Sequence, residues 1–336
     1  LTTTNNEVTI AEKNGVPSVE KKVQEDSKVG KTDEWGDSNT ADIGQTVNFK
    51  TTITARPGAQ NYVLHDKMDA GLTFDTNSVQ VKLKKKDETT ESAVAVSKYN
   101  VKTSGLENSN SCTFHVVFIQ EFCNTLEDGD QIIVTYSATL NDDVESKKNY
   151  KNETWLKYGE SNETNHDITT TKTFELPVFK YTTKNGNEIK LAGATFTLSK
   201  NANGTNPIEL VKTSEENAPE DIYRVAKTGD ADTVTSVTTP DSGKFTIKGL
   251  DADTYYLTET QQPDGYNKLS APITVVIAEN GNITVDTTTV NEVKVENKTG
   301  SILPSTGGSG TTLIYILGAI LVLGSSVVLI TKKRMR

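Results

Sequence analysis

Three residue types that together can form an amide bond occur twice in this sequence, each time at positions predicted to face inward. Residues two apart share one face of a β-strand, and Lys21 alternates in this way with Val19 and Val23. The six residues, each within such an alternating pattern, are Lys21, Asp66 and Asn152 in the first set and Lys180, Glu259 and Asn297 in the second.

Burial gives these groups a joint chemistry. A lone inward lysine is more often a misassigned register or a side chain that reaches solvent, but burying unpaired charge is costly, so a trio that occurs twice needs one explanation. Desolvation lowers the pKa of a lysine and raises that of a carboxyl group. A neutral amine is a nucleophile, and a protonated carboxyl can polarise the asparagine carbonyl while ammonia leaves.

We therefore predict two autocatalytic, single-turnover isopeptide bonds that need no cofactor and no metal. One joins Lys21 to Asn152 with Asp66 as the promoting acid, and the other joins Lys180 to Asn297 with Glu259 in that role. Lys22 and Asn149 are the neighbouring alternatives in the first set, and the alternation favours Lys21 and Asn152 over them.

Short strands must position these side chains. Runs such as 45–50 and 273–277 alternate polar with apolar residues, and Gly, Asn and Asp interrupt them about every ten residues. This spacing is typical of antiparallel sandwiches. With 336 residues, the chain is long enough for about two domains. We predict an all-β protein with two tandem immunoglobulin-like β-sandwich domains, followed by a C-terminal transmembrane helix.

The C-terminal residues predict the membrane segment and its orientation. Residues 311–330 contain no charged residue, and a helix of this length is long enough to cross a bilayer. Four of the last five residues of the chain are basic. Clustered Lys and Arg stay on the cytoplasmic side, so the acidic body lies outside. The net charge of −10 argues against a nucleic-acid-binding protein.

A short motif precedes the apolar segment. Leu303, Pro304, Ser305, Thr306 and Gly307, followed by the apolar segment and the basic tail, resemble the cell-wall sorting signal of Gram-positive surface proteins. The resemblance implies that a sortase cuts between Thr306 and Gly307 and joins Thr306 to an amine of the peptidoglycan precursor or of a neighbouring pilin. The membrane would then hold only the precursor, transiently.

Both halves of the body resemble parts of Gram-positive pilins. Residues 257–266, LTETQQPDGY, resemble the pilin E-box, and residues 191–198 and 243–250 resemble other signatures of the collagen-adhesin B-type domain. That resemblance implies an immunoglobulin-like sandwich with the trio Lys180, Glu259 and Asn297. Residues 17–23, 43–49, 65–74 and 129–138 resemble the isopeptide-forming middle domain of fimbrial backbone subunits, which implies Lys21, Asp66 and Asn152.

These patterns together predict the organisation of the chain. We expect 1–16 to be the remnant of an upstream domain or linker, 17–172 and 173–298 to be the two sandwich domains, 299–310 the sorting linker, 311–331 the transmembrane helix and 332–336 the cytoplasmic tail.

The predicted function is a structural subunit of a wall-anchored fimbria that supports adhesion, with a host surface ligand among its expected partners. The alternative is a monomeric wall-anchored adhesin that binds host matrix. Shaft pilins usually carry an acceptor lysine in a YPK-type sequence. This chain contains none, and we expect that lysine to lie upstream of Leu1.

The chain also contains two cysteines and three histidines, which are candidates for a disulfide or a metal site. Cys112 and Cys123 flank a predicted strand, and a disulfide is plausible outside the cell. Three zinc ligands, Cys112, His115 and Cys123, and a pair of free thiols are the alternatives, although no fourth ligand stands at a familiar spacing. Because no HExxH, GxSxG or Walker motif is present, we expect no turnover enzyme.

Overall fold

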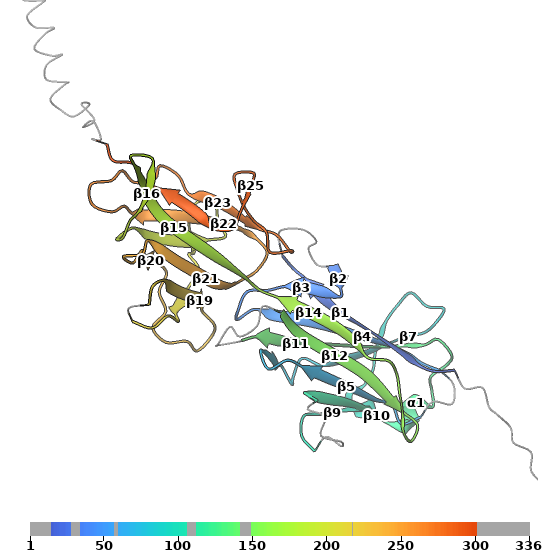
Figure 1. Ribbon diagram of the computed structural model, residues 1–336. Coiled ribbons are helices and arrows are strands. Elements are labelled where there is room, and N and C mark those ends of the chain that lie inside the picture. Colours follow the sequence, from blue (N-terminus) through green and yellow to red (C-terminus); the bar gives the residue numbers. More distant parts are fainter. Residues whose placement is uncertain are drawn as a thin grey trace, which may run out of the picture.

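The structure, a computed structural model, describes residues 15–27, 34–56, 60–105, 112–141, 149–216 and 218–300. The all-β prediction is confirmed: four sheets form two sandwiches that lie end to end, and the described chain begins and finishes at opposite ends of the molecule (Figure 1). The sorting motif and the apolar segment 311–331 lie outside the described residues. Within the described ranges no helix is long and apolar enough to cross a membrane.

The first sandwich consists of sheets A and B. In spatial order, sheet A contains β2 (Glu34–Gly36), β1 (Ser18–Glu25), β4 (Thr46–Thr54), β11 (Gln131–Leu140), β7 (Gln80–Lys84) and β8 (Ser92–Ala93), with β6 (Leu72–Phe74) also paired to β11. Sheet B contains β3 (Ser38–Thr40), β14 (Asp167–Lys172), β12 (Asn149–Tyr158), β5 (Val63–Met68), β10 (Phe114–Phe118) and β9 (Tyr99–Lys102), with β13 (Asn162–Glu163) paired to β12. A short α1 (Gln120–Cys123) and the 3₁₀ turn η1 (Val96–Lys98) lie in its connections.

The second sandwich consists of sheets C and D. In spatial order, sheet C contains β16 (Asn187–Lys190), β15 (Phe174–Lys184), β21 (Lys244–Leu250), β19 (Asp221–Val225) and β18 (Leu210–Lys212), with β26 (Val293–Glu296) parallel to β15. Sheet D contains β20 (Val237–Thr238), β17 (Thr195–Ser199), β22 (Thr254–Gln261), β23 (Ile273–Ile277), β24 (Ile283–Val285) and β25 (Thr288–Val290).

Alternation along the strands builds one core in each sandwich. In β4, Val47, Phe49, Thr51 and Ile53 are buried, whereas the residues between them are exposed or half-buried. β-Branched and aromatic side chains suit such half-buried pleated surfaces. A polar residue on the inward face of a strand is therefore carried between the two sheets together with its apolar neighbours.

The two sandwiches meet around Asp42 and Ile43, which precede β4. The Asp42 carboxylate accepts hydrogen bonds from the Asp251 backbone N–H and the Lys200 ammonium, both at 2.7 Å. Ile43 packs into the core of the second sandwich, and its N–H donates to the Gly249 carbonyl at 2.9 Å. Gly249 has φ +75°, and a Cβ there would lie 2.4 Å from Ile43. A larger residue would therefore displace the Ile43 side chain from this contact.

A single residue, Thr173, connects the sandwiches along the chain. It lies between β14 and β15, is buried, and donates its hydroxyl to the Leu250 carbonyl at 3.2 Å. The last strand of the first sandwich in sequence thus passes directly into the first strand of the second.

Candidate functional site

The first lysine, acid and asparagine trio lies between sheets A and B. Lys21 projects from β1 in sheet A, whereas Asp66 and Asn152 project from β5 and β12 in sheet B. All three are fully buried. The Lys21 Nζ lies 2.6 Å from Asp66 Oδ2, so the fold brings the amine of one sheet onto the carboxyl group of the other.

Tyr136, on β11, is a fourth member that sequence reasoning missed. Its hydroxyl contacts both the Lys21 amine and the Asp66 carboxyl group, and Asn152 Nδ2 donates to it at 3.4 Å. Phe49 and the Tyr136 ring also pack against the Lys21 ammonium. The alternation of Ile132, Val134 and Tyr136 could have placed this ring in the core, but not its hydroxyl beside the trio.

Burial sets the protonation of this first cluster. It lowers the pKa of Lys21, an effect that the Asp66 carboxylate opposes, and it raises the pKa of Asp66 against the influence of Lys21. The pKa of Tyr136 is raised well above its ordinary value, again chiefly by burial, so the phenol keeps its proton. Both shifts favour the uncharged amine beside the uncharged acid, which is the pair that amide formation needs.

The second trio is built from neighbouring strands of one sheet and a strand opposite. Lys180 is on β15, Asn297 directly follows the adjacent β26, and Glu259 projects from β22 in sheet D. The exposed fractions of Lys180, Glu259 and Asn297 are 0%, 2% and 1%. Lys180 Nζ lies 3.7 Å from Glu259 Oε1 and donates to the Val295 carbonyl at 3.0 Å.

Hydrogen bonds orient the acid and the amide of this second trio. Asn297 Nδ2 donates to Glu259 Oε2 at 3.0 Å and to the Asn267 carbonyl at 2.7 Å, and the Leu269 N–H donates to the same carboxyl oxygen at 2.8 Å. Burial lowers the pKa of Lys180 to about 8, against the opposing charge of Glu259. The amine is therefore far easier to deprotonate than an exposed lysine.

A glycine places the Lys180 backbone. Gly243 precedes β21 at φ +71°, and a Cβ there would lie 2.6 Å from the Lys180 carbonyl oxygen. The Lys180 N–H donates to the Gly243 carbonyl at 2.7 Å. Only a residue without a side chain allows this close approach in the left-handed region.

The two clusters leave the same atoms without a partner. Within the part of the chain that the structure describes, one oxygen of each acid, Asp66 Oδ1 and Glu259 Oε1, is buried and accepts no hydrogen bond. The same holds for the carbonyl oxygen of each asparagine, Asn152 Oδ1 and Asn297 Oδ1. Such orphaned groups are costly. A proton on each acid that bonds to the asparagine carbonyl would satisfy both atoms.

Comparison with known proteins finds similarity in two parts of the chain. Residues 175–292 match the SpaA family, described as a prealbumin-like fold domain. This part of the chain is therefore similar to that family. Residues 296–335, which follow that matched segment, match the LPXTG cell wall anchor motif. Lys180 and Glu259 therefore lie within the residues that match the SpaA family, and Asn297 lies just after them.

One curated relative and several solved structures resemble the chain. The relative is fimbrial subunit type 1 of Actinomyces viscosus, 38% identical over 85 residues, which are 25% of this chain and 16% of that protein. BcpA, the major pilin subunit of Bacillus cereus, has a TM-score of 0.54 and 18% identity over 85% of this chain and 71% of its own. The C-terminal fragment of the major pilin GBS80 of Streptococcus agalactiae has a TM-score of 0.56 and 18% identity, over 84% of this chain and all of that fragment. These two solved structures are similar in fold to 85% and 84% of the chain.

The cysteine prediction was wrong. Both cysteines are free: Cys123 lies in the core of the first sandwich, and Cys112 lies on the outside of sheet B, beside His65. The strand between them, β10, is extended, and its five residues span about 16 Å at roughly 3.3 Å each. A disulfide requires Cα atoms within about 7 Å, so a straight strand keeps these two apart. The alternative zinc site that included Cys123 fails for the same reason.

Proposed function

We propose that the chain is a structural subunit of a cell-wall-anchored fimbria, and that each of its sandwiches, 17–172 and 173–298, is closed by a Lys–Asn isopeptide bond. The observation that carries this proposal is the pair of buried trios with matching orphaned oxygens. In this reading the fold performs one reaction per domain on itself and has no turnover substrate.

Each reaction balances within its own cluster. The neutral lysine Nζ attacks the asparagine Cγ while the protonated acid donates a hydrogen bond to the carbonyl oxygen. The C–N bond to Nδ2 then breaks, and the acid relays the proton lost from Nζ to the departing nitrogen, so one ammonia leaves and one amide remains. Tyr136 would hold Lys21 and Asn152 on the same phenolic oxygen during the first of these reactions.

The LPXTG motif supplies the link to neighbours and to the wall. We propose that a sortase forms an acyl intermediate at Thr306 after cleaving the bond to Gly307, and transfers it to an amine of a neighbouring pilin subunit or of the peptidoglycan precursor. The mature protein would then be covalently anchored and extracellular.

Polymerisation predicts a defined change in wall extracts. In the bacterium that encodes the protein, we expect a ladder of multimers that survives boiling in detergent, and we expect Thr306→Ala to abolish it because that residue carries the acyl group. Ser305→Ala, at the variable position of the motif, is the matched control and should keep the ladder. A single wall-bound band in the parent strain would favour the monomeric adhesin, and wall attachment that survives Thr306→Ala would contradict sorting.

The pH dependence of the second reaction follows from the Lys180 pKa of about 8. Lys180 and Glu259 must together keep one proton, because the amine must be neutral while the acid is protonated. The rate should therefore be level just below pH 8 and fall above it, as the pair loses that proton. Chain recovered unfolded from inclusion bodies can be refolded across this range, and the Lys180–Asn297 peptide followed by mass spectrometry. A rate that climbs up to pH 8 would contradict Glu259 as the acid.

A further inference from the structure

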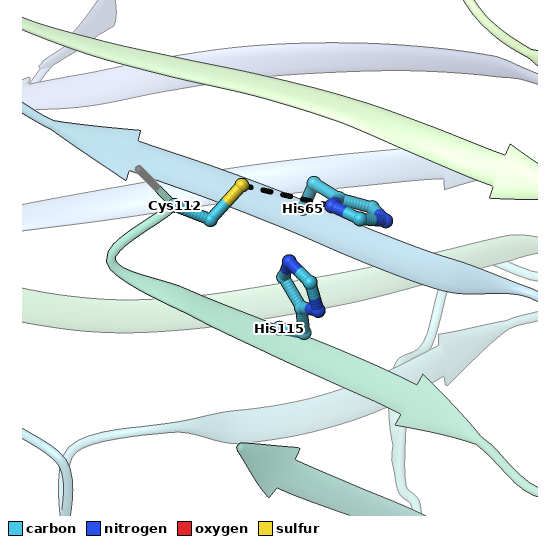
Figure 2. Close-up of side chains that lie close together, drawn as sticks. All are labelled: His65, Cys112 and His115. Atoms are coloured by element: carbon cyan, nitrogen blue, oxygen red, sulfur yellow. Dashed lines mark hydrogen bonds between the residues drawn. The ribbon is translucent and has the colours of Figure 1, made fainter. Parts of the chain in front are cut away.

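A histidine and cysteine cluster lies on the outer face of sheet B, away from both trios. His65 on β5 and His115 on β10 are paired directly across the two strands, and Cys112 lies just before β10. Figure 2 shows the thiol and the two imidazole rings pointing toward one another. Because strand faces alternate, His65 points away from the sandwich interior into which its neighbour Asp66 projects.

The spacing of the ligand atoms matches one metal ion. One nitrogen of each ring and the Cys112 Sγ all lie within 4.8 Å of one another, and Sγ lies 3.7 Å from His65 Nδ1. In tetrahedral zinc sites, with Zn–N of roughly 2.05 Å and Zn–S of roughly 2.3 Å, the N to S edge is about 3.6 Å. The two ring centroids lie 3.8 Å apart, so the imidazoles would have to separate by about 1 Å to bind one tetrahedral ion at these bond lengths.

The surroundings are those of a ligand site that is largely preformed. His65 and His115 are only 4% and 5% exposed, although they lie on the outer face of the sheet. His115 Nε2 is buried and has no hydrogen-bond partner among the described residues. The indole of Trp155 stacks on the His65 ring at 5.0 Å between centroids, which fixes the orientation of that imidazole.

An approach to the cluster is open. Cys112 is only partly buried, and a cavity of about 620 Å³ is lined by both histidines together with Lys102, Lys157 and Tyr158. The positive charges of the two lysines favour an anion, or a water molecule with its oxygen toward them, in this cavity. Such a ligand could fill the fourth coordination position of the ion. The negative thiolate offsets part of the repulsion between these lysines and a cation.

We propose that His65, Cys112 and His115 bind one thiophilic transition-metal ion of the Zn²⁺ class. Two imidazoles and a thiolate are the donors that such ions prefer, whereas Ca²⁺ and Mg²⁺ require oxygen ligands. Binding would convert the Cys112 thiol to a metal thiolate and release its proton to solvent. The ion would tie β5 to the segment that leads into β10, on the reverse side of the strand that carries Asp66.

Cobalt is the direct probe, because a Co²⁺–thiolate bond gives a charge-transfer band in the near ultraviolet. The chain through Thr306, reduced with a phosphine and stripped with a chelator, is titrated with Co²⁺ and then with Zn²⁺. We expect the band to saturate at one equivalent, Zn²⁺ to displace it, and one Zn²⁺ to remain after gel filtration. Zinc should also raise the thermal unfolding temperature of the first sandwich.

Matched variants identify the ligands. Cys112→Ser should abolish the band, and His115→Gln should weaken zinc binding at least tenfold, as loss of one ligand of three predicts. Cys123→Ala and His166→Gln change the other cysteine and the other histidine and should bind normally. Circular dichroism establishes that each variant is folded. Absence of the band and of retained zinc in the parent chain, or equal binding by Cys112→Ser, would overturn the proposal and leave the cluster as a thiol–imidazole packing contact.

Discussion

The Glu259→Ala variant should lack one ammonia relative to its calculated mass, whereas the parent chain through Thr306 should lack two. Without the acid, the asparagine carbonyl is not polarised and no proton is delivered to the leaving nitrogen. Lys180 and Asn297 should therefore remain unjoined. Intact mass under reducing conditions measures this directly, and peptide mapping locates the bond that is lost.

The same variant should also be much less stable. The bond closes a loop of about 120 residues, which in the chain-entropy model corresponds to roughly 5 kcal/mol of unfolding free energy. Denaturant titration of the parent and the variant would compare the two values. Glu292→Ala is the matched control: its carboxylate pairs with Lys244 at 2.7 Å near the surface, so it should keep both bonds and lose no more than about 1 kcal/mol. A Glu259→Ala chain that still lacks two ammonia molecules would exclude Glu259 as the promoting acid.

Asp66→Ala should have at least as large an effect on the first sandwich. It removes the acid that contacts Lys21 and Tyr136, so the bond between Lys21 and Asn152 should not form, and the chain should again lack a single ammonia. The lost cross-link joins sheet A to sheet B across a loop of about 130 residues, worth roughly 5 kcal/mol in the same model. The buried Lys21 also loses the carboxyl group that pairs with it, which adds to the destabilisation.

Two further variants separate the roles around Asp66. Tyr136→Phe keeps the acid and removes only the hydroxyl, so its bond should form slowly but to completion. Asp69→Ala changes a nearby carboxylate that accepts the Lys151 N–H at 2.9 Å outside the cluster, and it should form both bonds normally. If Tyr136→Phe never forms the bond, the phenol takes part in the proton transfer. If Asp66→Ala forms it, the assignment of this trio fails.

Strand alternation explains why much of this arrangement could be predicted. A period of two residues places Lys180 with Leu176 and Val178, and no knowledge of the partner strands is needed to predict that it faces inward. The all-β class and the tandem sandwiches follow from the same periodicity and from regular turn residues. Such local patterns carry over to the structure because the apolar neighbours decide the face.

Pairing between distant strands could not be predicted in the same way. Nothing local indicates that Lys21 and Asn152 belong to opposite sheets whereas Lys180 and Asn297 lie beside each other in one sheet. The Tyr136 hydroxyl lies beside Lys21 and Asp66, and the His65 ring lies beside His115, only because of how distant strands pair. That strand pairing depends on the whole fold. The cysteine prediction failed because residues that are close in the sequence need not be close in space. An extended strand separates Cys112 from Cys123.

The one-residue connection at Thr173 decides how tension would travel along a fimbria. With both proposed bonds formed, a load that enters at the N-terminal end crosses from Lys21 to Asn152, continues through β12, β14 and β15 to Lys180, and crosses to Asn297. The polypeptide within the two covalent loops, 22–151 and 181–296, then carries no load. Because only Thr173 separates β14 from β15, there is almost no slack to extend between the sandwiches. Extension before a covalent bond breaks should then be confined to the segments outside the two loops, chiefly the hydrogen-bonded pair of β12 and β14.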